Sequence, residues 1–262
     1  MKKRVLIKVG GRAFEKENVF AGLAKTILEN IENLALIIVH GGGAQISAAL
    51  TKAGRPTEFI DGIRKTQKED IEIIERILSQ EVNGHIVAQL NRYGVSCQSL
   101  SGKSTHLMIA EPWRPKGKDV GFVGKIVKVQ PSAVESAFME RKIPVVSPIS
   151  ADLDGNTYNI NADDAAAALA IGMCCTDLVY FTDVLGVKDN KGQVISHLTI
   201  SEANHWIEQG VIFNGMVAKV NSITDAILKG VERIHVTAWQ KETTLSDILS
   251  DESSLIKTTF TR

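Results

Sequence analysis

The chain has 262 residues, of which 44% are apolar and 23% are charged, as is ordinary for a globular protein with a substantial core. Thirty basic residues balance thirty acidic ones, so the basic excess typical of nucleic-acid-binding and polybasic membrane-surface proteins is missing. No apolar run approaches the roughly 18 residues of a membrane span, and Lys8 interrupts the short apolar segment near the start, which argues against a signal peptide. The three cysteines form no disulfide or C-x-x-C pattern, so we expect a soluble cytoplasmic protein.

Strand and helix patterns alternate along the first part of the chain. Residues 4–9 (RVLIKV) predict a strand, and apolar residues at every fourth position from Val19 to Ile31 predict the helix that follows. The continuous apolar run of residues 34–39 (LALIIV) is typical of a strand buried on both faces of a parallel sheet. Next come predicted helices over residues 44–53 and 67–91, and a predicted strand over residues 95–100.

A looser pattern interrupts this alternation at residues 107–129, where we expect a hairpin outside the main sheet. Beyond it we predict helices over residues 132–141, 162–173, 200–209, 216–228 and 244–249, strands over residues 143–149, 177–182 and 233–237, and a turn over residues 152–156. Strands separated by helices predict an α/β fold with a mainly parallel sheet that is covered by helices. If the chain forms two lobes, the small-residue helix at residues 165–173 offers the best boundary, although one continuous sheet is equally compatible with the pattern.

Glycine-rich turns follow the first two predicted strands. Gly10 and Gly11 come after the strand that carries Lys8, and residues 40–43 (HGGG) follow the second strand and run directly into a helix. Backbone N–H groups at such turns bind anions, and a helix N-terminus adds a positive partial charge. Because ligands bind beyond the carboxyl ends of parallel strands, the two loops form a candidate phosphate cradle. The alternative is that each loop is only a tight turn.

Other motifs are absent or incomplete. Residues 102–105 (GKST) resemble the end of a P-loop, but Cys97 stands where that motif needs its first glycine, and no G-x-G-x-x-G follows a predicted strand. Residues 40–43 could form the oxyanion loop of an esterase, but the chain has no G-x-S-x-G nucleophile elbow. The six histidines show no metal-ligand spacing with the cysteines, so we expect no metal ligands in the protein itself.

Two polar clusters lie at predicted helix starts. Residues 158–164 (YNINADD) place amides and carboxylates before an alanine-rich helix, where Asn161 can cap the helix and Asp163 suits the helix dipole. Residues 214–219 (NGMVAK) place Lys219 one turn into a helix, where a lysine opposes the dipole unless it meets an anion. Simple capping and a solvated lysine are the structural alternatives to a functional role.

Taken in order, these residues resemble the amino acid kinase family, and most closely its members that phosphorylate N-acetyl-L-glutamate in arginine biosynthesis. The segments that carry the resemblance are residues 6–11 (LIKVGG), 39–46 (VHGGGAQI), 61–66 (DGIRKT), 100–103 (LSGK), 121–127 (GFVGKIV), 144–149 (PVVSPI), 158–163 (YNINAD), 182–186 (TDVLG) and 215–220 (GMVAKV). The N-x-N-A-D phrase favours these members over carbamate, uridylate and aspartate kinases. The resemblance implies a three-layer αβα sandwich with a mainly parallel central sheet and two lobes, an acid-binding and dimerisation lobe over residues 1–173 and an ATP-binding lobe over residues 174–262.

The resemblance also implies a reaction. ATP, with Mg²⁺ bound through its phosphates, would donate its γ-phosphoryl group in line to the side-chain carboxylate of the acid, giving an acyl phosphate. Lys8 and Lys219 would flank the moving group, and Asp163 would hold the two lysines in place. The acid would contact Gly42, Gly43, Arg64 and Asn159, and the nucleotide would contact Gly10, Gly11, Asp183, Gly186, Val211, Ile212 and Phe213. The acceptor carboxylate is already an anion at neutral pH, so the reaction requires no general base.

The last third of the sequence departs from the family pattern. Residues 236–240 (VTAWQ) replace the usual I-D-G turn after the last strand, and residues 253–259 (SSLIKTT) stand where a glycine-threonine pair is usual. Both changes bear on the adenine contacts. The extra N-terminal helix of the arginine-inhibited hexameric members is missing, so we expect a homodimer without arginine feedback. The alternatives are a sibling kinase that acts on another amino-dicarboxylate, such as an aminoadipate derivative, and a non-catalytic regulatory homologue.

Overall fold

An eight-stranded sheet organises the computed structural model of the chain, which describes residues 2–10, 17–213, 215–251 and 254–262. In spatial order the strands are β12 (His197–Thr199), β14 (Thr258–Thr261), β13 (Arg233–Thr237), β11 (Asp177–Phe181), β1 (Lys3–Val9), β2 (Leu34–His40), β8 (Ile143–Ser147) and β5 (Cys97–Ser101). The six strands from β13 to β5 are mutually parallel, and β14 pairs antiparallel with β13. The predicted mainly parallel sheet is therefore confirmed.

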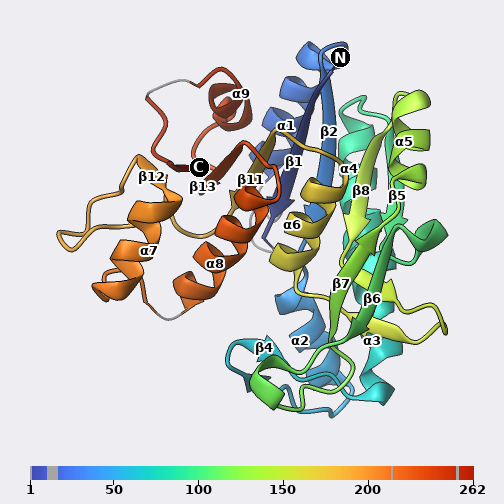
Figure 1. The fold of residues 1–262 in the computed structure, drawn as a ribbon. Coiled ribbons are helices and arrows are strands. Elements are labelled where there is room, and N and C mark those ends of the chain that lie inside the picture. The colour runs from blue at the N-terminus through green and yellow to red at the C-terminus, as the bar shows by residue number, and fades with distance from the viewer. Residues whose placement is uncertain (1, 11–16, 214, 252–253) are drawn as a thin grey trace.

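Helices cover both faces of this sheet (Figure 1). One face packs against α5 (Ser132–Met139), α6 (Ala162–Gly172), α7 (Ile200–Glu208) and α8 (Gly215–Leu228), and the other packs against α1 (Glu17–Asn30), α4 (Asn83–Arg92) and α9 (Thr244–Leu249). Successive residues of a strand point to opposite faces, so Leu6 of β1 enters the first core while Val5 and Ile7 enter the second. This double burial explains the continuous apolar strands, and it confirms the three layers.

Two smaller sheets lie beside the main one. The larger has the order β10 (Thr157–Asn159), β9 (Ile149–Ala151), β6 (Met108–Pro112) and β7 (Gly124–Val129). Its antiparallel β6–β7 pair is the hairpin that the sequence predicted outside the main sheet. The smaller is a hairpin of β3 (Phe59–Ile60) and β4 (Ile63–Arg64), which the sequence analysis did not predict. The strand predicted over residues 143–149 is divided at Pro148 between β8 and β9.

The helix predicted over residues 67–91 is built from four consecutive segments. They are η2 (Lys68–Asp70), α3 (Ile71–Glu75), the π-helical η3 (Arg76–Val82) and α4. Leu78 of η3 packs against the start of α2 (Gly43–Lys52), where a Cβ on Gly42 would lie 2.5 Å from the Leu78 Cδ2 atom. Glycine at position 42 therefore permits a close approach of the helix to the loop.

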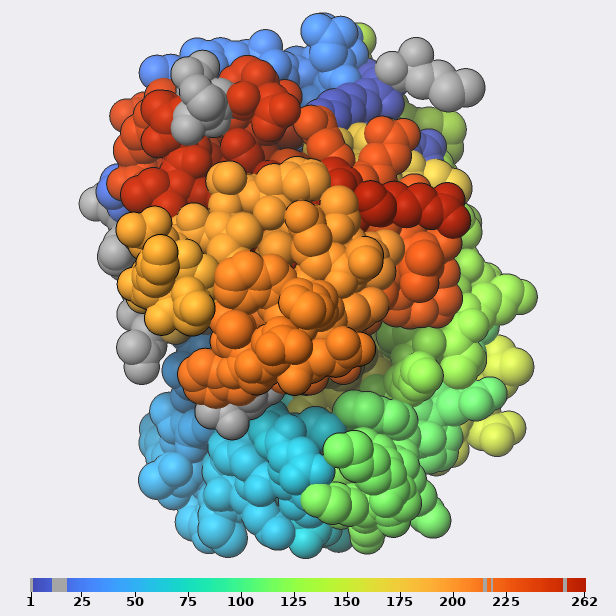
Figure 2. All heavy atoms as spheres, turned by 60° about the vertical axis from the view of Figure 1, so that its left-hand side comes forward, coloured from blue at the N-terminus to red at the C-terminus, as the bar shows by residue number. Residues whose placement is uncertain are grey.

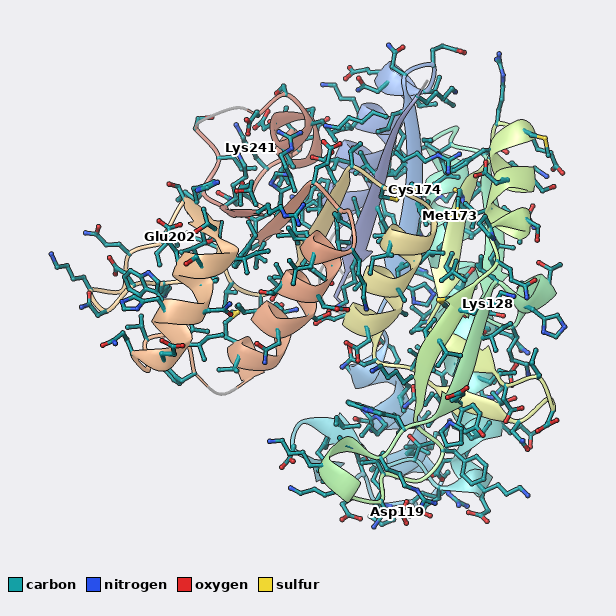
Figure 3. All side chains as sticks on the ribbon, in the orientation of Figure 1. Asp119, Lys128, Met173, Cys174, Glu202 and Lys241 are labelled. Carbon is teal, nitrogen blue, oxygen red and sulfur yellow. The ribbon has the colours of Figure 1, made fainter. Side chains whose placement is uncertain are left out.

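The short strands β12 and β14 were also missing from the predicted elements, and they extend the sheet beyond β13. The predicted lobe boundary falls between Met173 and Cys174, labelled in Figure 3, at the end of α6. Strand β1 pairs with β11 across this boundary, so one sheet runs through both proposed lobes, and the division remains a prediction. Among the described segments, no helix combines the length and apolar character needed to cross a bilayer.

A buried carboxylate ties together the strands at the amino-terminal edge of the sheet. Asp177 of β11 is only 2% exposed and lies 3.1 Å from Lys3 Nζ, 2.9 Å from an Arg233 guanidinium nitrogen and 3.3 Å from His235 Nε2. Burial acts to raise the pKa of Asp177, but hydrogen bonds from His235 and Thr176 and the nearby positive charges hold it well below its ordinary value. The ionised carboxylate thus joins β1, β11 and β13.

Candidate active site

The carboxylate of Asp163 lies between two lysines at the carboxyl-terminal edge of the sheet. Lys8 Nζ, from β1, is 2.8 Å from Oδ1, and Lys219 Nζ, from α8, is 2.5 Å from Oδ2. The side chains of Lys8, Lys219 and Asp163 are 14%, 15% and 23% exposed, so water screens them only partly. Burial acts to raise the pKa of Asp163, but the charges of the two lysines outweigh it and lower the pKa below its ordinary value. Two ammonium groups facing one carboxylate leave a net positive charge that suits an anion.

The start of α6 fixes the position of Asp163. The Asn161 side chain caps the helix by accepting hydrogen bonds from the backbone N–H groups of Asp163, at 2.8 Å, and Asp164, at 3.4 Å. The predicted capping role is therefore confirmed, and it coexists with the lysine contacts. Burial and the adjacent Asp163 charge raise the pKa of Asp164 to about 6, so the two neighbouring carboxyls differ in their readiness to ionise.

A cavity of about 280 Å³, which we call the glycine-loop cavity, opens beside Lys8 and Asp163. Its walls come from the two glycine loops, the β3–β4 hairpin and the segment that leads into α6. They include Gly10, Gly41, Gly42, Gly43, Phe59, Arg64, Asn159 and Asn161. The structure therefore brings together the catalytic and acid-binding residues that the sequence analysis named.

The second glycine loop offers backbone donors to this cavity. Gly42 is the N-cap of α2, and the first hydrogen bond inside the helix runs from the Ile46 N–H to the Gly42 carbonyl. The N–H groups before Ile46 have no partner inside the helix, so they can bind an anion at its positive end. The Gly10 N–H instead donates to the Phe181 carbonyl at 3.2 Å. Gly11 lies outside the described residues.

Arg64 of β4 stands beside the start of α2. One guanidinium nitrogen donates to the Gly43 carbonyl at 2.8 Å and to Ser47 Oγ at 2.9 Å, and the other donates to Thr57 Oγ1 at 3.3 Å. The guanidinium also lies 4.8 Å from the centre of the Phe59 ring. Burial lowers the pKa of Arg64 below its ordinary value. These contacts hold a cation at the wall of the glycine-loop cavity.

Asn159 lines this cavity, whereas His40 is buried behind the second glycine loop. Asn159 Nδ2 donates to Thr66 Oγ1 at 3.1 Å, and the side chain lines the cavity. His40 is fully buried, with Nδ1 lying 2.8 Å from the Gly41 carbonyl oxygen and Nε2 lying 3.1 Å from Asn83 Nδ2. Because an amide nitrogen only donates, Nε2 accepts and Nδ1 carries the proton. Burial lowers the pKa of His40 to about 4, so a neutral ring positions the glycine loop.

Asn83 was not among the predicted site residues. It is fully buried and also donates to the Val145 carbonyl at 2.9 Å, which links the start of α4, the glycine loop and β8. Its sequence position inside a predicted helix gives no signal of this role, because the partners lie far away in the chain.

A second cavity, of about 490 Å³, lies between α6, α8 and β7 and meets the first at Asp163. Lys219, Asp164 and Lys125 contribute to its walls, and we call it the α6–α8 cavity. In Figure 2 the orange segment that contains α7 and α8 faces the cyan and green segments that contain β4 and the β6–β7 loop. The two cavities therefore approach the cluster of Lys8, Asp163 and Lys219 from two sides.

Apart from Gly10 and Gly11, the residues predicted to contact the nucleotide lie in two turns of the last third of the chain. Asp183 and Gly186 follow β11, and a Cβ on Gly186 would lie 2.5 Å from Thr258 Oγ1. Between α7 and α8, Ile212 is 3% exposed and packs in the core, whereas Phe213 is 63% exposed. Among the described residues, neither these four nor Val211 lines either cavity. Their role remains a prediction.

Comparison with known proteins identifies the family. A model of the amino acid kinase family matches residues 3–238. The chain belongs to the amino acid kinase family. An acetylglutamate kinase from Rhizobium etli is 38% identical over 243 residues, covering 88% of this chain and 82% of that protein. Acetylglutamate kinases from Methanococcus aeolicus, 35% identical with 89% and 84% coverage, and from a Janthinobacterium species, 34% identical with 96% and 88% coverage, match similarly.

Solved structures agree on the fold of this family. The smu.665 protein from Streptococcus mutans is 28% identical and superposes with a TM-score of 0.81 over 92% of this chain and 97% of that one. An N-acetylglutamate synthase from Neisseria gonorrhoeae complexed with coenzyme A and N-acetyl-glutamate gives a TM-score of 0.84 at 20% identity, over 99% of this chain and 59% of that one. A carbamate kinase from Giardia lamblia bound to AMP-PNP gives 0.64 at 16% identity, over 100% and 99%. The last two likenesses concern the fold alone.

Proposed function

We propose that the protein transfers the γ-phosphoryl group of ATP to the side-chain carboxylate of N-acetyl-L-glutamate, a step of arginine biosynthesis. The observation that carries this proposal is the pair of lysines, Lys8 and Lys219, on one carboxylate beside a small cavity that also presents Arg64 and helix N–H donors. Relatives named acetylglutamate kinase, 34–38% identical over most of the chain, support the same substrate.

The reaction needs charge neutralisation more than proton transfer. An oxygen of the acceptor carboxylate attacks the γ-phosphorus while the bond to the β,γ-bridging oxygen breaks, so that an acyl phosphate and ADP form. The acceptor is ionised at neutral pH, so no proton has to move. Lys8 and Lys219 stabilise the charge on the transferring group, and Asp163 keeps both ammonium groups at the same place.

The size of the glycine-loop cavity and the cation in its wall support a site for the acid. A glycine-loop cavity of about 280 Å³ suits a small acid better than a nucleotide. Arg64 would bind a carboxylate of the acid through its paired donors, and Asn159 would bind a polar group. We therefore propose that residues 1–173 bind the acid and residues 174–262 bind ATP, with Gly10, Asp183, Gly186 and residues 211–213 bordering the nucleotide.

We propose that Mg²⁺ arrives bound to the phosphates of ATP, where it would shield their negative charge. Among the described residues, no group of three or more His, Cys, Asp and Glu side chains is arranged to hold a metal ion. Each oxygen of Asp163 already faces a lysine, which makes this carboxylate a poor ligand.

We also propose a cytoplasmic homodimer. The cytoplasm supplies ATP, and the family resemblance favours a dimer. Light scattering tests the assembly, since a hexamer would contradict it.

A hydroxylamine-trapping assay tests the reaction and the substrate together. The purified protein is incubated with MgATP, hydroxylamine and, separately, N-acetylglutamate, glutamate, aspartate and aminoadipate, and the hydroxamate is measured. Hydroxamate with N-acetylglutamate alone is expected. Hydroxamate with another acid would assign a sibling kinase. If no hydroxamate forms with any of the four acids, although a separate measurement shows that ATP binds, the protein would be a non-catalytic homologue.

A further inference from the structure

Tyr180 of β11 lies directly under the reaction centre. It pairs in register with Lys8 on the neighbouring strand β1, so the two side chains leave the same face of the sheet. The Tyr180 side chain is only 1% exposed. Its ring centre lies 4.8 Å from Lys219 Nζ, and its hydroxyl donates to the backbone carbonyl of Asp163 at 3.2 Å. The buried Tyr180 side chain therefore contacts both Lys219 and Asp163.

The ring contact restrains the Lys219 ammonium group, and the hydroxyl contact restrains the backbone at Asp163. An ammonium group over the face of an aromatic ring is attracted by the ring quadrupole, more strongly where water is excluded. Burial, with the charges of Asp163 and Asp164, raises the pKa of Tyr180 well above its ordinary value, so the hydroxyl keeps its proton and remains a donor. Ser222, three residues after Lys219 on α8, interacts with the same hydroxyl. Tyr180 thereby joins α6 and α8 to β11.

The Asp163 carboxylate alone does not fix Lys219. Lysine has four rotatable side-chain bonds, and its ammonium group is a compact charge without directional preference. A contact with one carboxylate oxygen leaves the ammonium group free to swing about that oxygen. The ring of Tyr180 occupies a second side of the ammonium group and restricts that motion.

We propose that Tyr180 is a positioning residue for phosphoryl transfer, with its ring holding the Lys219 ammonium group and its hydroxyl holding the helix turn that carries Asp163. This inference rests on the proposed kinase function. A misplacement of a catalytic group costs turnover rather than ground-state binding. The change should therefore appear in kcat and leave KM for the acid and for ATP nearly unaltered.

Two substitutions separate the contributions of the ring and the hydroxyl. Tyr180→Phe keeps the ring and loses the hydroxyl, and we expect kcat to fall about 2- to 10-fold, as for one neutral hydrogen bond. Tyr180→Leu loses both groups, and we expect a fall of about 10- to 100-fold. Leu178→Ala is the matched control, because Leu178 lies on the same strand and core face but beside Leu6 instead of Lys8. Its kcat should stay within about 2-fold of the wild type, at a temperature where circular dichroism finds all variants folded.

A double-mutant cycle asks whether the ring acts through Lys219. In the wild-type background kcat is expected to differ clearly between Phe and Leu at position 180. With Lys219→Ala this difference should disappear, because no ammonium group remains to be held. A ring that only fills space would give the same Phe-to-Leu ratio in both backgrounds, and that result would overturn the proposal.

An NMR measurement tests the ring contact independently of activity. The Lys219 ε-methylene resonance, assigned by comparison with Lys219→Arg, should be shifted upfield by the aromatic ring in the wild type and in Tyr180→Phe, and should lose that shift in Tyr180→Leu. An unshifted resonance in the wild type would overturn the positioning contact. If the wild type makes no hydroxamate with any acid while the shift is present, the proposed function fails and the ring contact stands.

Discussion

Lys8 and Lys219 approach different oxygens of one carboxylate, although β1 and α8 are far apart in the sequence. The distances from Nζ to the Asp163 oxygens are 2.8 Å and 2.5 Å. Removing either lysine would leave one ammonium group paired with one carboxylate, so the site would lose its excess positive charge. We therefore predict that both lysines are needed to attract and stabilise a transferring phosphoryl group.

Lys8→Ala and Lys219→Ala should each lower kcat by about 10²- to 10³-fold, the usual cost of one preorganised donor at a developing charge. The hydroxamate assay at saturating acid and ATP measures this. Lys128→Ala is the control, because Lys128 is an exposed residue of β7, labelled in Figure 3, and should keep normal turnover. Near-normal turnover in either lysine variant would refute the role of that lysine.

Arg64→Lys should raise KM for the acid about 10- to 100-fold and change kcat much less, because a lysine keeps the charge but loses the paired donors. Steady-state kinetics with varied acid at saturating ATP measures both constants. Lys65→Ala serves as the control, since Lys65 forms an exposed pair with Glu58 at 2.9 Å. An unchanged KM in Arg64→Lys would place the acid elsewhere.

His40 should make the protein less stable as the pH falls from about 6.5 to about 4. In this window the unfolded chain protonates the imidazole, whose ordinary pKa is 6.5, while the buried ring stays neutral because its pKa is lowered to about 4. The expected loss is about 3 kcal/mol of unfolding free energy. Urea denaturation across this range measures the loss, and His40→Gln should give a flatter profile. Parallel profiles for the two proteins would contradict the assignment.

Asp177→Asn should lower the free energy of unfolding by about 3–5 kcal/mol at neutral pH, because it leaves Lys3 and Arg233 without their buried counter-charge. The pKa of Asp177 is lowered in the folded state, so its stabilisation is complete above the unfolded value of about 3.9 and is lost as the pH falls below it. Urea denaturation at neutral pH measures the loss of unfolding free energy in Asp177→Asn. The exposed-pair variant Glu140→Gln should change stability by less than about 1 kcal/mol. An equally small effect in Asp177→Asn would mean that the cluster is dispensable.

The sequence predicted the middle of the sheet more accurately than its edges. Strands β2 and β11 were placed to within one residue, because strands buried on both faces are mainly apolar runs. The two-residue strands β3 and β4, and the three- and four-residue strands β12 and β14, carry no comparable run. Their pairing depends on partners supplied by the rest of the fold. The π-helical turn at Arg76–Val82 likewise has no signature in its apolar spacing.

The candidate site was predictable where a residue belongs to a motif. Lys8, Asp163 and Lys219 each lie in a family segment, and the structure brings them together. Tyr180 was read only as part of a strand, because a tyrosine among apolar residues looks like any core residue. Its significance lies in what it touches, and those partners come from α6 and α8.

The pairing of β1 with β11 limits how the protein can be divided. The two strands are in register from Val5 with Asp177 to Val9 with Phe181, across the proposed lobe boundary. A chain cut between residues 173 and 174 would give one fragment with β1 unpaired on that side and another with β11 unpaired, each exposing a bare strand edge prone to association. Because the two proposed halves share one sheet, we expect neither to fold without the other.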